Sequence, residues 1–160
     1  MTTMCIMAAN YLIERTNEYN ENIEYRNQIP MSCKRLQKLL YFGDILFMKN
    51  HEGRSMFCDD FYAWPSGPVI PSVYDKFMQY QDGRMKPVLG EHTPLNNDMV
   101  EALYNVFDKT KHIETEELVE MSHIKKGPWD QVYDPDDSGH FQIVSKMAMY
   151  EFYKNRDVFC

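Results

Sequence analysis

Four cysteines and five histidines are the side chains of this sequence that could form a nucleophile and its base. Cys33 falls in the first turn of a predicted helix, beside Lys34 and Arg35, where a helix N-terminus and nearby cations lower the pKa of a thiol. A small cysteine-dependent enzyme would use Cys33 or Cys58 with a histidine such as His123. Nothing else marks a thiol as activated, so Cys33 is better interpreted as a small buried hydrophobe and His123 as a structural histidine.

The local signatures of the commonest enzyme classes are missing from the sequence. It contains neither G-x-G-x-x-G nor G-x-x-x-x-G-K-[ST] to cradle phosphates, and neither H-E-x-x-H nor G-x-S-x-G. Asp59 and Asp60 are adjacent, so in a strand they would point to opposite faces and could not act as a paired acid and base. We therefore predict no catalytic site and no cofactor.

One acidic stretch is similar to a calcium loop. Residues 134–139 read D-P-D-D-S-G, like the first half of an EF-hand loop, whose oxygens bind calcium. Ser145 replaces the bidentate glutamate that ends such a loop, and Pro135 stiffens its second position. An acidic loop that caps the following helix explains the same residues, because carboxylates complement the positive end of a helix dipole. We therefore predict no metal site.

Lys34, Arg35 and Lys38 form the one basic cluster on a predicted helix. Their spacing could meet a phosphate backbone, but 17 basic against 24 acidic residues give the chain a formal net charge of −7. A net charge of this sign opposes nucleic-acid binding, so we expect a solvated helix face instead. We expect no membrane partner either, because the apolar run at 39–43 is far shorter than the ~20 residues of a membrane span.

Length and composition are those of a globular chain. The 160 residues are 44% hydrophobic and 26% charged, which excludes disordered and fibrous architectures. No repeat or linker divides them, so we expect a single domain over 1–160. The uncharged start has neither a basic region nor a cleavage site of the kind found in signal peptides. We therefore expect a cytoplasmic protein with free thiols.

The elements that must position these side chains are mainly helices. Apolar residues recur at i, i+3, i+4 and i+7 after Ser32, a plausible N-cap, and predict a central helix over 32–50. Five more helices are expected: over 8–16, from Pro71 to Asp82-Gly83, from Asn97 or Asp98, from near Thr115, and over 138–153 with Phe141 buried.

Two short strands complete the predicted fold. Residues 61–64 are dense in β-formers and precede a tight turn at 65–68, and residues 85–89 are expected to pair with them. The predicted class is α+β, predominantly α-helical, with about six helices around the central helix and a small two-stranded element. Trp64 and Trp129, each beside a Gly-Pro dipeptide, are expected to lock loops onto this core rather than form a binding hot spot.

Three segments, taken in order, carry a resemblance to a known family. They read R-L-Q-K-L-L-Y-F at 35–42, F-Y-A-W-P-S-G-P-V-I-P-S-V-Y at 61–74 and H-I-K-K-G-P-W-D at 123–130. The K-L-L-Y-F run is weak alone, whereas A-W-x-x-G-P-V-x-P-x-V-Y joined to H-x-x-x-G-P-W is specific. Over about 31–153 the chain resembles the Panacea domain of SocA-like antitoxins and phage-associated bacterial proteins.

This resemblance implies an antitoxin of a bacterial or prophage toxin–antitoxin system, not an enzyme. Such a protein binds and neutralises a cognate toxin protein, directly or as an adaptor that delivers the toxin to a protease. A phage-associated protein with no toxin partner stays open as an alternative. The resemblance implies no catalytic, metal or cofactor residues, and makes the motif residues scaffold or partner-binding residues: Gln37, Lys38, Tyr41, Trp64, Gly67, Pro68, Tyr74, His123 and Trp129.

Overall fold

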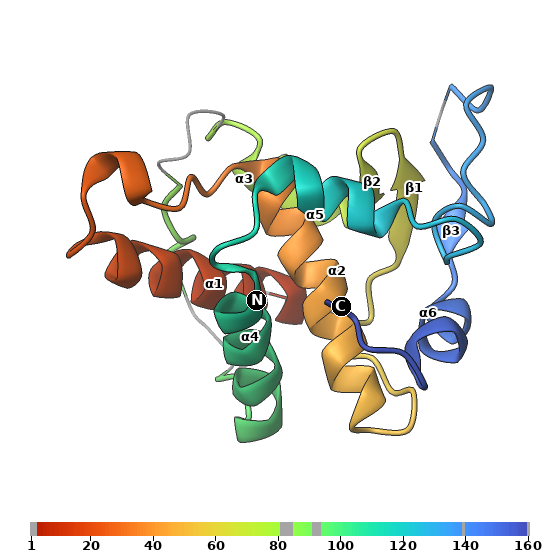
Figure 1. The fold of residues 1–160 in the computed structure, drawn as a ribbon, viewed down its shortest axis with the longest axis horizontal. Helices are drawn as coiled ribbons and strands as arrows, with labels where there is room; N and C mark the ends of the chain where they lie inside the picture. The colour runs from red at the N-terminus through yellow and green to blue at the C-terminus, as the bar shows by residue number, and fades with distance from the viewer. Residues whose placement is uncertain (1–2, 81–84, 91–93, 139, 160) are drawn as a thin grey trace.

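The computed structural model describes residues 3–80, 85–90, 94–138 and 140–159. In these residues the chain forms six α-helices and three short strands, and the other five helices pack around α2 (Figure 1). The predicted class, α+β with mostly helical content, is confirmed. The predicted two-stranded element is corrected to three strands.

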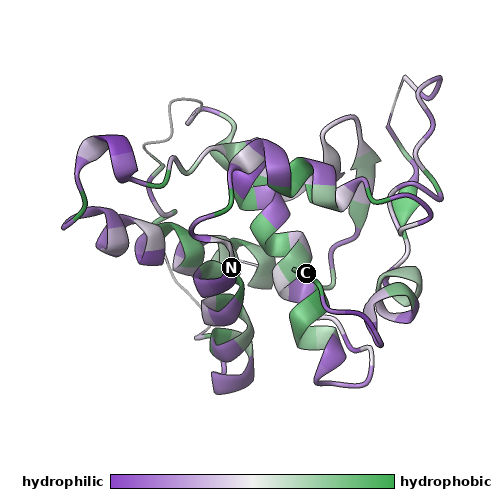
Figure 2. Ribbon diagram, in the orientation of Figure 1, coloured by the Kyte–Doolittle hydropathy of each residue, from purple (hydrophilic) through white to green (hydrophobic). Residues whose placement is uncertain are grey.

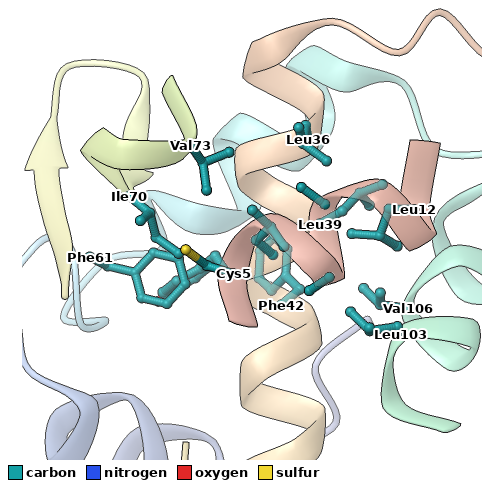
Figure 3. Packing of buried hydrophobic residues seen from close by; sticks show 14 of the residues in the cluster. Cys5, Leu12, Leu36, Leu39, Phe42, Phe61, Ile70, Val73, Leu103 and Val106 are labelled. Carbon is teal, nitrogen blue, oxygen red and sulfur yellow. The ribbon is translucent and has the colours of Figure 1, made fainter. Parts of the chain in front are cut away.

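The central helix α2 runs from Cys33 to Lys49, within the predicted span. The hydroxyl of Ser32 caps it by accepting a hydrogen bond from the backbone N–H of Arg35 at 3.1 Å. The helix is buried on nearly all its sides rather than along one stripe, because helices and the sheet surround it. Figure 3 shows its Leu39 in the middle of the core.

Helices α1 (Met4–Asn20) and α4 (Asn97–Thr110) pack against α2 and against each other. Leu12 of α1 and Val106 of α4 meet the leucines of α2 in the core (Figure 3). A Cβ on Gly43 of α2 would lie 3.3 Å from the Val106 side chain, so the glycine lets the two helices approach closely. Helix α4 begins where predicted, and α1 is longer at both ends than predicted.

Strands β1 (Phe61–Trp64), β2 (Gly67–Val69) and β3 (Ile143–Val144) form an antiparallel sheet in the order β2-β1-β3. The prediction of β1 is confirmed, but its predicted pairing with residues 85–89 is wrong. Strand β1 pairs instead with β2, which follows directly after a two-residue turn. Pro68 is tolerated in β2 because this strand lies at the edge of the sheet.

Residues 85–90 form no strand because a side chain of α1 takes the place of a strand partner. Asn10 Nδ2 donates a hydrogen bond to the carbonyl oxygen of Val88 at 3.0 Å, and Asn10 Oδ1 accepts one from the Val88 N–H at 2.8 Å. Asn10 thus supplies the donor and the acceptor that a neighbouring strand would offer.

The remaining helices are α3 (Pro71–Phe77), α5 (Thr115–Ser122) and α6 (Lys146–Tyr153). Helices α3 and α5 begin where predicted, α3 with its proline in the first turn. The third helix was predicted to run as far as Asp82-Gly83, which was wrong, because α3 already ends at Phe77. Asp82 and Gly83 themselves lie outside the described residues. Hydrophobic residues gather where these elements meet α2, and hydrophilic residues cover the outer side of α4 (Figure 2). None of the helices that the structure describes is long and apolar enough to cross a bilayer.

The start of the last helix was predicted wrongly. The helix begins at Lys146, where the hydroxyl of Ser145 accepts a hydrogen bond from the Ala148 N–H, rather than at 138. The preceding residues pair with β1 as β3 instead. Phe141, expected in the core, is 76% exposed.

Candidate functional site

Lys38 lies on α2 and is completely buried, with 0% of its surface exposed. Its Nζ donates a hydrogen bond to the carbonyl oxygen of Pro68 in β2 at 2.7 Å. Burial lowers the pKa of this ammonium group to about 7, because surroundings of low dielectric disfavour the charged form. The predicted solvated face was therefore wrong at Lys38, since β2 packs over the side of α2 that the apolar stripe left polar.

The Gly-Pro corner closes over Lys38. Gly67 has a φ of +113°, and a Cβ there would lie 2.5 Å from Ser122 Oγ and 2.8 Å from Lys38 Cε. Only glycine fits both this backbone and this space. Ser122 is itself buried at the end of α5, where its hydroxyl donates to the carbonyl oxygen of Val119 at 2.7 Å. The corner thereby joins α2, the sheet and α5.

Gln37, the neighbour of Lys38, holds the residue that follows β2. Its Nε2 donates to the Ile70 carbonyl oxygen at 3.1 Å, and its Oε1 accepts from the Ile70 N–H at 2.9 Å. Both residues are buried. Two consecutive side chains of α2 therefore bond the backbone along β2 and its end, which positions the whole hairpin against the central helix.

The other two cations of the basic cluster are also occupied. Arg35 is 2% exposed, and its guanidinium donates to the carbonyl oxygens of Thr110 and Ile113 at 2.8 and 2.9 Å. Lys34 Nζ lies 3.1 Å from a carboxylate oxygen of Glu116. The cluster does not form a free basic face, because two of its three cations are buried against the protein.

Trp129, His123 and Tyr133 form a stack of nearly parallel rings. The ring centroids of His123 and Trp129 are 3.8 Å apart, and those of Trp129 and Tyr133 are 4.4 Å apart. Burial and, second, the nearby Lys38 charge lower the pKa of His123. Its Nε2 is buried and has no hydrogen-bond partner among the residues that the structure describes. Trp129 is 7% exposed and donates from Nε1 to the carbonyl oxygen of Trp64 at 2.8 Å.

Trp64 is half-buried and lines a groove of about 440 Å³ beside β1. The ring of Tyr74, also half-buried, meets it edge-on with 5.0 Å between centroids. The sequence predicted no groove here, although the alternation of Tyr62 and Trp64 on one side of a strand could have indicated a shared face. The other residues that line the groove include Asp59, Asp60, Tyr62, Ser72, His140 and Phe141.

Tyr41 lies inside the core. It is 0% exposed, and the centroid of its ring lies 5.1 Å from that of Phe42 and 5.6 Å from that of Phe61. Burial raises the pKa of its hydroxyl, for which the described part of the chain offers no hydrogen-bond partner. The structure therefore places Tyr41 among packing residues, away from any surface.

Burial works against nucleophilic chemistry at the thiols. It raises the pKa of Cys33 to about 11 and also raises that of Cys5, so both are protonated at neutral pH. Cys33 is 5% exposed, which confirms its interpretation as a small buried hydrophobe. Cys58 is exposed.

Two aspartates of the acidic stretch after Trp129 accept hydrogen bonds from nearby backbone N–H groups. Asp134 accepts from a backbone N–H two residues on, and Asp137 accepts from the Phe141 N–H, both at 2.9 Å. The prediction that this loop caps the last helix was wrong, because Ser145 does so. In 3–80, 85–90, 94–138 and 140–159 no group of three or more His, Cys, Asp or Glu side chains is placed to hold a metal ion. Gly139, the end of the calcium-like string, lies outside these ranges.

Comparisons with known proteins agree with the motifs. The family model for "Antitoxin SocA-like, Panacea domain" matches residues 36–130, more than half of the chain. A curated relative, Antitoxin SocA of Caulobacter vibrioides (strain NA1000 / CB15N), is 36% identical over 115 residues, which cover 65% of this chain and 61% of the relative. No solved structure matches the chain. The matched range contains Lys38, the Gly-Pro corner and Trp129, and the chain belongs to the SocA-like, Panacea-domain antitoxin family.

Proposed function

We propose that this protein is an antitoxin that binds a cognate toxin protein and neutralises it. The observation that carries the proposal is the 36% identity over 115 residues to a protein named Antitoxin SocA, together with the family match. The chain spans 61% of the length of that relative. The contacts within this chain are therefore a second line of support for toxin binding.

The motif residues use their polar groups on the chain's own backbone. Lys38 bonds Pro68, Gln37 bonds Ile70, and Trp129 bonds the Trp64 carbonyl. Groups occupied in this way hold a fold together instead of acting on a substrate. This supports a protein that binds its partner through its outer surface, with Trp64 and Tyr74 as partner contacts. The other motif residues then form the scaffold: Gln37, Lys38, Tyr41, Gly67, Pro68, His123 and Trp129.

A cysteine-dependent enzyme is the weaker candidate, because burial raises the pKa of Cys33 to about 11. Iodoacetamide labelling at neutral pH separates the two proposals. The antitoxin proposal expects Cys33 to react more slowly than free cysteine, because the thiol is protonated and buried. Labelling far faster than that of free cysteine would favour the enzyme.

Co-expression tests the proposal directly. The product of the gene beside this one is induced in a bacterial expression host alone, with this chain, and with an unrelated protein of similar charge. Growth arrest relieved only by this chain supports an antitoxin, and an unchanged toxin level identifies neutralisation by binding, whereas a fallen level identifies delivery to a protease. A neighbouring product that is harmless, or arrest that persists with this chain, contradicts the proposal and favours a phage-associated protein without a toxin.

A further inference from the structure

The outer face of the small sheet carries side chains that remain open to solvent. In β1, Tyr62 and Trp64 are half-buried, while the alternate residues Phe61 and Ala63 are buried. Ile143 of β3 lies opposite Tyr62 and is 45% exposed, and Phe141 just before it is 76% exposed. Figure 2 shows β3 as a hydrophobic segment at the periphery, away from α2. Exposed apolar and aromatic groups gathered on one face are typical of contact surfaces.

The groove on this face combines aromatic walls with negative charge. Trp64, Tyr62 and Phe141 line it together with two carboxylates. Asp60 is exposed, and Asp59 accepts a hydrogen bond from the Ser72 hydroxyl at 3.1 Å. Among the residues that the structure describes, the groove lining includes no lysine or arginine to pair with the two carboxylates.

The groove is also held in shape before any partner arrives. The Trp129 indole fixes the Trp64 carbonyl, and Tyr74 fixes the Trp64 ring from the side. A rigid aromatic contact loses little conformational entropy on binding, which is the property of binding hot spots.

We propose that this groove binds an arginine side chain presented by the toxin, a proposal that rests on the function proposed above. A guanidinium is planar and always charged, so it can stack on an aromatic ring such as Trp64 and bond the Asp60 carboxylate at the same time. A volume of about 440 Å³ accommodates one long side chain, and Phe141 offers an apolar rim to the residues beside it. The net charge of −7 favours approach of a basic partner.

One wall of the groove lies outside the residues that the family model matches. Trp64 and Asp60 lie inside the residues that the family model matches, whereas His140 and Phe141 lie beyond its end at residue 130. The matched part supplies the aromatic and acidic contacts to the arginine.

Toxin affinity is measured for the wild type, for Asp60→Asn and Phe141→Ala, and for two matched controls, Glu117→Gln on α5 and the exposed Tyr25→Ala. We expect each groove variant to weaken binding by about tenfold and each control to stay within about twofold. Equal affinity for all five proteins overturns the groove and leaves the proposed function standing. If the wild type binds no toxin, the proposed function is overturned. A peptide titration then tests separately whether the groove binds arginine.

The peptide experiment uses the two tryptophans as separate reporters. A short Leu-Arg-Leu peptide, and its citrulline analogue as the uncharged control, are titrated while the indole N–H signals are followed by NMR. We expect the Trp64 signal to move with the arginine peptide only, and the buried Trp129 signal to move less. No movement at millimolar peptide, equal movement with citrulline, or the same movement with calcium ions overturns the proposal. A dimer abolished by Phe141→Ala in sedimentation also overturns it, because a second copy would then cover the groove.

Discussion

The indole Nε1 of Trp129 donates a hydrogen bond to the backbone carbonyl oxygen of Trp64 at 2.8 Å. The two tryptophans thus connect the loop after α5 to the end of β1, across 65 positions of sequence. Trp129 is 7% exposed, whereas Trp64 is half-buried and lines the groove. Trp129 therefore supports Trp64, which forms part of the groove surface.

Trp129→Phe tests this support. The phenyl ring can keep part of the stack on His123 and Tyr133, but the Trp64 carbonyl loses its donor, so we expect the free energy of unfolding to fall by about 2 kcal/mol. Urea unfolding followed by circular dichroism measures the change. Tyr25→Phe, at an exposed tyrosine, is the control and is expected to change stability little. A Trp129→Phe variant as stable as the wild type would show that the hydrogen bond contributes nothing.

The Gly-Pro corner predicts a large difference between two glycines. Gly67 and Gly90 both have positive φ values, +113° and +144°. A Cβ at Gly67 would lie 2.5 Å from Ser122, whereas one at Gly90 would meet no described residue within 4 Å. Gly67→Ala is expected to lose about 3 kcal/mol, from both backbone strain and overpacking, and Gly90→Ala about 1 kcal/mol, from the backbone alone. Thermal and urea unfolding compare them. Equal losses would contradict the close packing of Lys38 and Ser122 under the corner.

The two hydrogen bonds of Gln37 predict a further loss of stability. Gln37→Leu leaves the buried N–H of Ile70 without its acceptor, whereas the Ile70 carbonyl oxygen keeps the N–H donors of Val73 and Tyr74. We expect this change to cost about 2 kcal/mol. Gln131→Leu is the matched control, because Gln131 is exposed and its side-chain amide donates to the Lys126 carbonyl. We expect its effect to stay below about 0.5 kcal/mol. Similar stabilities of the two variants would mean that the helix does not hold β2 through this amide.

Lys38 predicts a pH dependence of stability. Its pKa is about 7 in the fold against 10.5 ordinarily, so between these values the unfolded chain binds more protons than the folded one. The free energy of unfolding must therefore rise with pH, by up to ~1 kcal/mol per pH unit. Urea unfolding between about pH 7 and about pH 8.5 measures this slope below the range where the raised thiol pKa values act in the opposite direction.

The Lys38→Met variant isolates that slope. Methionine keeps most of the length but does not titrate, so the rise with pH should be lost, although the unbonded Pro68 carbonyl lowers stability at every pH. Lys125→Met, at an exposed lysine, should keep the wild-type slope. A slope unchanged in Lys38→Met would mean that Lys38 stays protonated inside the protein.

The sequence pattern correctly predicted the elements that depend on residues close to them in the chain. The Ser32 cap, the start of α3 at Pro71 and the strand β1 depend on neighbouring residues, and all three are present. The burial of Lys38 was missed because it depends on a hairpin that covers the polar side of α2. The strand expected at 85–89 was predicted wrongly because Asn10, 78 positions away, takes its backbone bonds.

The candidate site followed the same division. The motifs identified the supporting residues, such as Trp129 and Gly67, because tight turns and large aromatics are visible in a sequence. The groove was not visible, since it forms only when β3 pairs with β1 and brings Phe141 beside Trp64. Residues 138–145 were instead predicted to be helical, because their apolar residues recur at the spacing of a helix.

Isothermal titration calorimetry with the purified product of the neighbouring gene measures whether the outer surface of this scaffold binds a toxin. We expect a saturable complex whose dissociation constant rises as salt is added, because an acidic chain attracts a basic partner through charges that salt screens. Heats that show no saturable binding at any ionic strength would contradict it.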